Sequence, residues 1–278
     1  MSADGNGIVL KDAREIEKLR RSARLVREIL EEVRARLQPG VQTIELERHV
    51  VKRLEQAGAK PAFKGYRGYP CCLCTSVNEE ILHGIPSARR LKEGDIVGLD
   101  LGVVLDGYYG DSALTAPVGK VSGEAERLLS VTEEALELAI REAHLGNRVG
   151  YISAAVQGYV EKNRFSVVRE FVGHGIGRAL HEEPQVPNYG QPGHGPQLKE
   201  GMVLALETMV TAGGPDLRIM RDHWTAVTAD GSNAAHFEHM VAITRNGPDV
   251  LTREWDKVGP DANPARSPGP ANVEARGA

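Results

Sequence analysis

Residues 95–113 read DIVGLDLGVVLDGYYGDSA, and this stretch decides the fold. Asp106 and Gly107 separate two apolar runs, which is a strong hairpin signal because both central residues of a type I′ turn need a positive φ. Side chains on a strand alternate between its two faces, so a two-residue loop puts Asp100 and Asp111 on the same face as diagonal neighbours. The stretch therefore predicts an antiparallel hairpin that presents two carboxylates together.

Two aspartates on one face of an apolar hairpin have two interpretations. Asp is depleted in strands, and a buried carboxylate without a partner costs free energy. In the first interpretation the pair lies at a solvated sheet edge and binds lysine or arginine side chains. In the second, a cation lies between the two carboxylates. The hairpin alone leaves both interpretations open, so other parts of the chain have to decide between them.

Four further stretches place polar residues where apolar ones are expected. ILHGIP puts His83 before a turn, and FVGHGIG flanks His174 with glycines, which let backbone and ligand approach closely. MVLALETMV and FEHMV each contain one glutamate, Glu207 or Glu238, in an apolar, strand-like run. Taken singly, these residues are ordinary turn or loop histidines and solvated strand carboxylates.

Considered jointly, the residues of the hairpin and of three of these stretches form a set of candidate metal ligands. Their donors are four carboxylates and one imidazole, and such an oxygen-rich set suits two divalent ions better than a closed structural zinc site, which prefers Cys and His. Four carboxylates in one place could not all ionise without cations between them. The set consists of Asp100, Asp111, His174, Glu207 and Glu238.

Composition restricts the class of protein. The 278 residues are 41% hydrophobic and 26% charged, as in ordinary globular proteins, and a net charge of −4 gives no electrostatic case for binding DNA. No apolar run approaches the ~20 residues that span a bilayer, and the N-terminus lacks the basic and apolar segments of a signal peptide. Three cysteines cannot form a disulfide framework. We therefore expect a cytoplasmic protein without membrane contact.

The periodic segments follow the same order twice, as two helices and then several strands. Asp12 followed by Glu15 is a helix N-terminal signal, and the apolar stripe after it continues to Leu37. We expect helices over residues 12–37, from Thr43 to Gly58, from Ser122 to about His144 and from Val149 to about Lys162. FSVVREF, GMVLALETMV and HMVAIT read as strands of the second half. The order predicts an α+β fold, with a four-helix layer behind one largely antiparallel sheet and ligands on the open face.

An ordered set of motifs extends over most of the chain: SVNEEILHGIP, DIVGLDLGVVLDGYYGDSA, GHGIG, LHEEPQVPNYG, the Glu207 strand and DHWTAVTADGSNAAHFEH. In order and spacing they resemble the type I methionine aminopeptidases, over about residues 12–247. The resemblance implies the pita-bread fold, with two pseudo-symmetric αβ halves, a central antiparallel sheet and helices on its outer face. It also implies removal of the initiator methionine from nascent chains when the second residue is small.

The resemblance and the composition divide the chain into three parts. Residues 1–11 are expected to be an N-terminal extension, and residues 12–252 a single metallo-aminopeptidase catalytic domain. Residues 259–278 are rich in Pro, Gly and Ala and have no periodicity, so we expect a disordered tail.

The resemblance also assigns roles to individual residues. Asp111 and Glu238 would bridge two divalent ions, Asp100 would complete one ion, and His174 with Glu207 would complete the other. The implied catalytic residues are His83, His181 and Glu207. The methionine pocket would be lined by Tyr66, Tyr69, Cys74 and Trp224, with Phe63 and Leu180 in further pocket positions and His83 and His181 also contacting substrate. Cys71, Cys72 and Cys74 could suggest a zinc knuckle, but three close cysteines without a fourth favour a wall position for Cys74.

The expected chemistry is metal-assisted hydrolysis. Two ions roughly 3.5–4 Å apart share a water and lower its pKa, and the resulting hydroxide attacks the first peptide carbonyl. His181 would stabilise the oxyanion, Glu207 would transfer the proton, and His83 would hydrogen-bond the scissile amide. Co, Mn, Fe, Zn and Ni all tolerate such ligands, so the sequence does not choose among them. The expected partners are the N-termini of nascent polypeptides and the ribosome, and we expect a monomer.

The sequence departs from the family pattern at four positions, none of which removes a ligand. Thr208 follows the metal-binding glutamate where proline is usual, and Gly102 replaces a threonine. Leu82 precedes His83 where cysteine is common, and Met240 replaces another threonine. We expect these changes to alter how groups around the site tune the ligands, and hence metal affinity and rate.

Two alternative functions stay open at this point. An Xaa-Pro aminopeptidase or prolidase has the same fold, but such relatives usually carry an additional N-terminal domain, and only about ten residues precede the first helix here. A non-catalytic binding protein on the same fold would have lost ligands, whereas this chain keeps all five.

Overall fold

The predicted hairpin is the centre of the structure. In the computed structural model, which describes residues 2–3 and 7–253, β6 (Ile96–Leu105) and β7 (Tyr108–Pro117) pair antiparallel with Gly102 opposite Asp111. Asp106 and Gly107 have φ of 51° and 80°, as a type I′ turn requires. The register predicted from residues 95–113 is therefore confirmed. The predicted tail, residues 259–278, lies outside the described residues.

A second long antiparallel pair joins the first and completes the core of the sheet. β11 (Val203–Thr211) pairs with β14 (Ala234–Thr244), and β14 also pairs with β7. The large sheet has the order β10-β9-β11-β14-β7-β6-β3, with β15 on β14, β4 on β6 and β8 on β11. The remaining strands of this sheet are β3 (Lys60–Pro61), β4 (Leu73–Val77), β8 (Ser166–Val167), β9 (Val172–Gly175), β10 (Glu182–Pro187) and β15 (Gly247–Val250).

Two smaller sheets flank the large one. β5 (Glu80–Leu82), β13 (Ala226–Thr228) and β12 (Leu217–Ile219) form a three-stranded sheet, and β1 (Ser2–Ala3) pairs with β2 (Val9–Leu10) near the N-terminus. A short 3₁₀ turn, η1 (Tyr66–Gly68), lies between β3 and β4. The three-stranded sheet matters for function because it ends beside His83 and Trp224.

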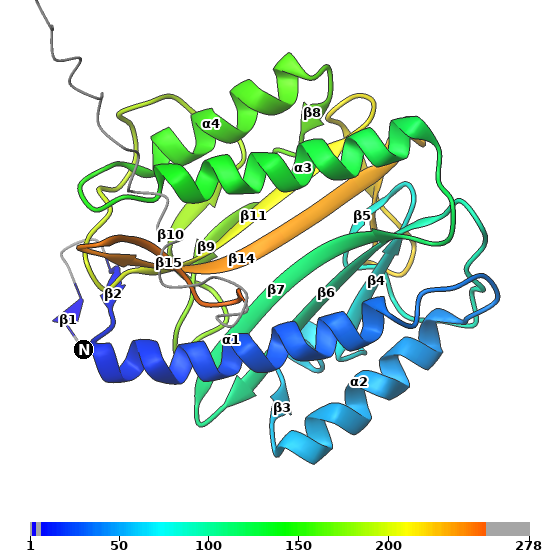
Figure 1. Cartoon of the computed structure of the whole chain (residues 1–278), viewed down its shortest axis with the longest axis horizontal. Helices are drawn as coiled ribbons and strands as arrows, with labels where there is room; N and C mark the ends of the chain where they lie inside the picture. The colour runs from blue at the N-terminus through cyan, green and yellow to red at the C-terminus, as the bar shows by residue number, and fades with distance from the viewer. Residues whose placement is uncertain (1, 4–6, 254–278) are drawn as a thin grey trace, which may run out of the picture.

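Four helices cover one face of the large sheet in two pairs, one from each half of the chain (Figure 1). They are α1 (Ala13–Arg34), α2 (Thr43–Ala57), α3 (Gly123–Glu142) and α4 (Val149–Lys162). α1 packs on β6 and β7, and α3 packs on β11 and β14. The α+β fold and the two-half order predicted from the sequence are confirmed. None of the helices in the described residues is long and apolar enough to cross a membrane.

The helix starts agree with the sequence signals, but two helix ends do not. Asp12 and Glu15 form the predicted capping box of α1. The prediction continued α1 to Leu37, whereas the helix ends at Arg34, because the amides of Arg36 and Leu37 bond to carbonyls three residues back. α3 likewise ends at Glu142, since the following amide of Ala143 bonds to Ile140. The first helix-breaking residue after an apolar stripe, such as proline or glycine, therefore gives only the latest position at which the helix can end.

The strand prediction for FSVVREF was wrong for most of its length. Only Ser166 and Val167 pair with β11, opposite Thr211 and Val210. Arg169 and Glu170, which complete the charged end of the segment, are exposed. Charged side chains next to an apolar pair favour a chain that leaves the edge of the sheet after that pair.

Gly110 fixes how closely α1 approaches the sheet. A Cβ at Gly110 would lie 2.6 Å from the carbonyl carbon of Ser22 and 2.9 Å from the amide nitrogen of Ala23. Ser22 adds a hydrogen bond from its hydroxyl to the carbonyl oxygen of Tyr108, at 3.0 Å. The helix backbone thus lies directly on the strand at a position where the sheet has no side chain. Asp111, the next residue, faces away from α1 into the open side of the sheet.

We expect Gly110→Ala to lower the free energy of unfolding by about 1–3 kcal/mol, because the added methyl group forces α1 away from β7. Urea denaturation followed by circular dichroism measures the effect. Gly123→Ala is the matched control, because a Cβ at Gly123 meets no atom within 4 Å. Equal stabilities of the two variants would contradict the close approach of α1.

Candidate metal centre

The pairing of four strands puts three of the predicted ligands in one row. Glu207 on β11 lies directly opposite Glu238 on β14, and Glu238 in turn pairs with Ala113 on β7. Ala113 lies opposite Asp100 on β6. Directly opposed residues of an antiparallel sheet point to the same face, so the three carboxylates lie on the face that the helices leave open.

The other two predicted ligands lie on the same face as this row, because side chains two residues apart on a strand point the same way. Asp111 is two residues before Ala113 on β7, and His174 on β9 lies opposite Ala205, two residues before Glu207. One ligand atom each of Asp111, His174 and Glu238 lies within 4.8 Å of the others. The Nδ1 of His174 lies 2.9 Å from the carbonyl oxygen of Gly175, so an Nδ1–H donates there and leaves Nε2 for a metal.

Unpaired oxygen atoms show that the cluster fits a cation. Asp111 Oδ1 and Glu238 Oε1 are buried, and neither has a hydrogen-bond partner within the described residues. Burial, together with the neighbouring carboxylates, raises the pKa of both groups well above the ordinary value, and burial raises the pKa of Asp100 to about 7. A divalent ion relieves this electrostatic cost, because carboxylate oxygens are its preferred ligands. The donor set therefore fits divalent ions.

A cavity of about 240 Å³ opens above the ligands. All residues to which the sequence assigned a metal, catalytic or pocket role line this cavity. They are Asp100, Asp111, His174, Glu207, Glu238, His83, His181, Tyr66, Tyr69, Cys74, Trp224, Phe63 and Leu180. The structure thus brings every predicted site residue to one place.

His181 lines the cavity beside His174, one of the predicted ligands. Its ring centroid is 4.3 Å from that of His174, and its Nδ1 is 2.8 Å from the hydroxyl oxygen of Tyr66. Although the residue as a whole is exposed, the ring is partly enclosed. This desolvation, followed by the charge of His174, lowers the pKa of His181 to about 4. A neutral imidazole can donate one hydrogen bond into the cavity.

His83 directly follows β5 and also lines the cavity. The residue has φ of 60°, a left-handed conformation that is uncommon for non-glycine residues. Its ring packs edge-on against Phe171 and Trp224, with centroid distances of 5.6 and 6.1 Å. Burial lowers the pKa of His83 to about 4, so the imidazole is neutral at physiological pH.

An aromatic and sulfur-containing wall completes the cavity. Tyr69 packs edge-on against Trp224, with ring centroids 5.2 Å apart. Cys74 lies directly opposite Asp100 in the β4–β6 pair, so its side chain faces the cavity beside that carboxylate. Burial raises the pKa of the Cys74 thiol well above its ordinary value, so the group is a neutral, apolar surface.

His236 belongs to the site and was missed from the sequence. Its Nε2 is buried 3.4 Å from Glu207 Oε2, without hydrogen-bond geometry to any partner in the described part of the chain. Burial disfavours the charged forms of both side chains, but the attraction between the imidazolium and the carboxylate outweighs this effect. The pKa of His236 is therefore raised, and the pKa of Glu207 is lowered. His236 precedes Glu238 by two residues and so shares its face of β14, but only the pairing with β11 brings it to Glu207. Arg67, Phe171 and Val172 also line the cavity without having been predicted.

The four departures from the family pattern have identifiable contacts. Thr208 donates from its hydroxyl to the carbonyl oxygens of Thr132 and Phe237, which links β11 to α3. The Sδ of Met240 accepts the backbone N–H of Asp111 at 3.2 Å. A Cβ at Gly102 would lie 2.5 Å from the ring of Phe63, so glycine lets that ring enter the cavity wall. Leu82 lines the cavity itself.

Comparison with known proteins assigns the family. The model described as "Metallopeptidase family M24" matches residues 17–245. Methionine aminopeptidase 1 of Bacillus subtilis is 50% identical over 246 residues, which are 88% of this chain and 99% of the relative. The chain belongs to metallopeptidase family M24. The methionine aminopeptidase of Clostridium perfringens is 48% identical over 245 residues, 88% of this chain and 98% of the relative.

Solved M24 structures have the same fold. The methionine aminopeptidase of Thermotoga maritima superimposes with a TM-score of 0.87 at 47% identity, and the match covers 89% of this chain and 100% of that one. The prolidase of Pyrococcus furiosus has a TM-score of 0.73 at 22% identity, with 88% of this chain and 66% of that chain covered. The second match shows the shared pita-bread fold alone. This M24 chain is therefore a pita-bread metallopeptidase.

Proposed function

We infer that this M24 chain is a methionine aminopeptidase, a hydrolase that cleaves the peptide bond after an N-terminal methionine. The observation that carries this inference is the joint placement of a cation-binding carboxylate cluster and an apolar, sulfur-containing wall in one cavity. The relatives at 48–50% identity over nearly their full length support the same activity. No observation favours the prolidase alternative, whose structural likeness is limited to the fold.

We propose that two divalent ions bind between the two halves of the sheet. Asp111 and Glu238 would hold both ions, Asp100 one of them, and His174 with Glu207 the other. The unpaired oxygens of Asp111 and Glu238 support this assignment, because each has a lone pair directed at no protein donor in the described residues. Bound ions supply Lewis acidity and lower the pKa of water, which permits attack on a peptide carbonyl at neutral pH.

The side chains around the ions divide the remaining tasks. Glu207, whose carboxylate pKa is lowered by the neighbouring imidazoles of His236 and His174 despite burial, would accept the proton of the attacking water and pass it to the leaving amine. His181 would donate a hydrogen bond to the developing oxyanion. His83 would hydrogen-bond the scissile amide. The neutral state of both histidines supports roles as single hydrogen-bond donors.

The cavity supports selection of methionine. An unbranched, polarisable side chain fits an aromatic and sulfur-containing surface, and methionine sulfur makes favourable contacts at ring edges. Tyr69, Trp224 and Phe63 supply the rings, and Cys74 supplies a neutral thiol. We propose that the pocket excludes β-branched and charged side chains for lack of width and of a charged partner.

We propose nascent polypeptides with a small second residue as the physiological substrates, and the cytoplasm as the location. The name of the relatives, methionine aminopeptidase, supports a substrate with an N-terminal methionine. Association with the ribosome and a monomeric state stay predictions.

We expect the purified chain to hydrolyse Met-Ala-Ser and to lose this activity on treatment with a chelator, because the attacking water needs a bound cation to lower its pKa. Release of free methionine measures the activity, and addition of a single divalent metal should restore it. Xaa-Pro peptides are the discriminating control. Cleavage of Ala-Pro-Ala in preference to Met-Ala-Ser, or full activity in the chelator, would contradict the proposed function.

A further inference from the structure

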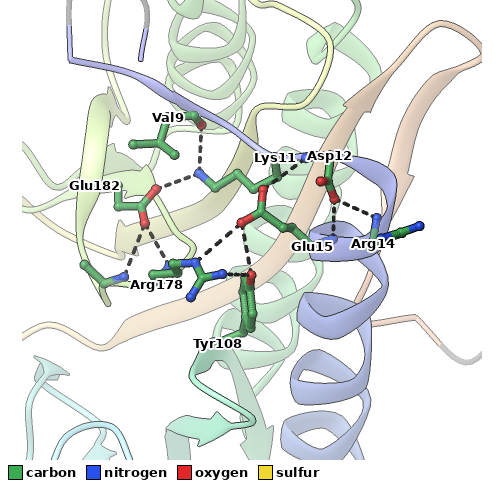
Figure 2. Close-up of polar contacts among 9 residues, drawn as sticks. Val9, Lys11, Asp12, Arg14, Glu15, Tyr108, Arg178 and Glu182 are labelled. Atoms are coloured by element: carbon green, nitrogen blue, oxygen red, sulfur yellow. Dashed lines mark hydrogen bonds and ion pairs between the residues drawn. The ribbon is translucent and has the colours of Figure 1, made fainter. Parts of the chain in front are cut away.

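The loop that carries His181 is fastened to the start of α1 by a buried ion pair. Figure 2 shows Lys11, which precedes the helix, next to Glu182, which follows His181 in the chain. Lys11 Nζ lies 2.6 Å from Glu182 Oε2 and also donates to the carbonyl oxygen of Val9 at 3.0 Å. The two side chains are 3% and 10% exposed. Buried pairs are sensitive to geometry, because either charge alone would be left unsolvated.

The second oxygen of Glu182 holds the loop itself. Glu182 Oε1 accepts the backbone N–H groups of Arg178 and Ala179 at 2.9 and 3.2 Å (Figure 2). The Glu182 carboxylate therefore stabilises the turn that begins at Arg178, and it also links this turn to Lys11. The ring of His181 projects from this turn.

Two glycines leave room for this contact. A Cβ at Gly177 would lie 2.7 Å from Lys11 Cε and 2.6 Å from Glu182 Oε1. On the other side, a Cβ at Gly201 would lie 2.6 Å from the carbonyl oxygen of Lys11. The backbone N–H of Lys11 donates to the carbonyl oxygen of Gly201 at 2.8 Å. Gly177 is the last glycine of the GHGIG motif, which begins one residue before the ligand His174. The motif thus accommodates both the metal ligand and the ion pair.

A second contact joins the same loop to the helix start. The guanidinium of Arg178 donates to the hydroxyl of Tyr108 and lies 3.4 Å from Glu15 Oε1, which also accepts the Tyr108 hydroxyl (Figure 2). The other oxygen of Glu15 caps α1 by accepting the N–H of Asp12. Because the Arg178 side chain is 51% exposed, solvent weakens this contact relative to the buried pair.

We propose that Lys11 and Glu182 are positioning residues for His181. The contacts of the ring with Tyr66 and His174 hold the imidazole, whereas the ion pair holds the backbone from which the imidazole projects. The inference rests on the oxyanion role proposed for His181. A shift of about 1 Å at a catalytic group can lower the rate about 100-fold, so a loosened loop should act on kcat.

Lys11→Met removes the charge and retains most of the alkyl stem. We expect it to lower kcat on Met-Ala-Ser about tenfold or more, with KM within about twofold and with the metal content of the wild-type protein. Lys11→Arg, which keeps the charge, should recover most of the lost kcat. Arg20→Met is the matched control, because Arg20 lies on α1 and forms a partly buried ion pair with Asp249 at 2.6 Å. This control should lower thermal stability and leave kcat unchanged.

The decisive measurement repeats Lys11→Met in a His181→Ala background. If Lys11 acts through His181, it should change kcat there by less than about twofold. An equal fold-loss in both backgrounds would overturn the proposal, and so would a Lys11→Met variant that loses thermal stability but keeps the wild-type kcat. Should the single variant fold poorly, Lys11→Met with Glu182→Gln leaves no unpaired charge buried and carries the same test.

Hydrogen exchange separates this inference from the proposed function. Amides of residues 177–182 should exchange faster in Lys11→Met than in Arg20→Met, whatever the substrate is. Unchanged exchange in this segment would overturn the inference while the wild-type protein still cleaved Met-Ala-Ser. A wild-type chain inactive on Met-Ala-Ser would instead overturn the proposed function and, with it, the positioning role.

Discussion

Asp111→Ala is expected to abolish hydrolysis of Met-Ala-Ser, and Glu238→Ala is expected to do the same. Each side chain has a buried oxygen without a protein partner in the described residues, and each is assigned to both ions. Loss of either side chain therefore weakens both metal sites at once. Removal of a bridging ligand should reduce the rate below detection, because no other residue of the cluster can replace it.

Metal stoichiometry and thermal unfolding show why the activity is lost. Both variants should bind fewer ions than the wild-type chain in equilibrium dialysis. The metal-free Asp111→Ala protein should nevertheless unfold at the same temperature as the metal-free wild-type protein or higher, because one of several crowded carboxylates is gone. Asp106→Asn is the control: it removes a carboxylate from the exposed tip of the same hairpin, where Asn tolerates the left-handed backbone. Full activity of Asp111→Ala would refute the ligand assignment.

His181→Ala should lower kcat about 10²–10³-fold while KM changes little. In the proposed role His181 donates to an oxyanion that exists only during the reaction, and a hydrogen bond formed only to the transition state acts on kcat. Loss of one oxyanion donor costs roughly 3–4 kcal/mol in other hydrolases. The ring neighbours of His181, Tyr66 and His174, remain in place in this variant.

Two further variants separate catalysis from metal binding. His181→Ala should keep the wild-type metal content, whereas His174→Ala should lose metal from one site. His194→Ala is the control, because His194 lies in an exposed loop and contacts the carbonyl oxygen of Pro192. If His181→Ala loses metal as His174→Ala does, His181 is a ligand. If its kcat stays near that of the control, the oxyanion role is wrong.

Local sequence signals were sufficient wherever one residue or one turn determines the structure. The Asp106-Gly107 turn fixed the register of β6 and β7, and Asp12 with Glu15 fixed the start of α1. Period-two alternation then placed Asp100 and Asp111 on one face. These predictions needed no knowledge of distant parts of the chain, because each depends on backbone geometry within a few residues.

Predictions failed where distant contacts decide the outcome. The end of α1 depends on hydrogen bonds in its last turn, and FSVVREF leaves the sheet although its composition suits a strand. His236 was missed because its role depends on Glu207, a residue of another strand. The Lys11–Glu182 pair was invisible for the same reason, since sequence spacing does not reveal a contact between the chain start and a loop in the second half.

The pairing of β7 with β14 has a consequence for the order of folding. Asp100 and Asp111 come from the first half of the chain, whereas His174, Glu207 and Glu238 come from the second. The β6–β7 and β11–β14 pairs each close within one half of the chain, but the β7–β14 contact joins the two halves and has a higher contact order and a larger loop-closure cost. A chain in which only one half has folded therefore brings together only some of the five proposed ligands. The proposed divalent ions would bind the fully docked state in preference to such intermediates and stabilise it by mass action, so we expect metal uptake to be the last step of maturation.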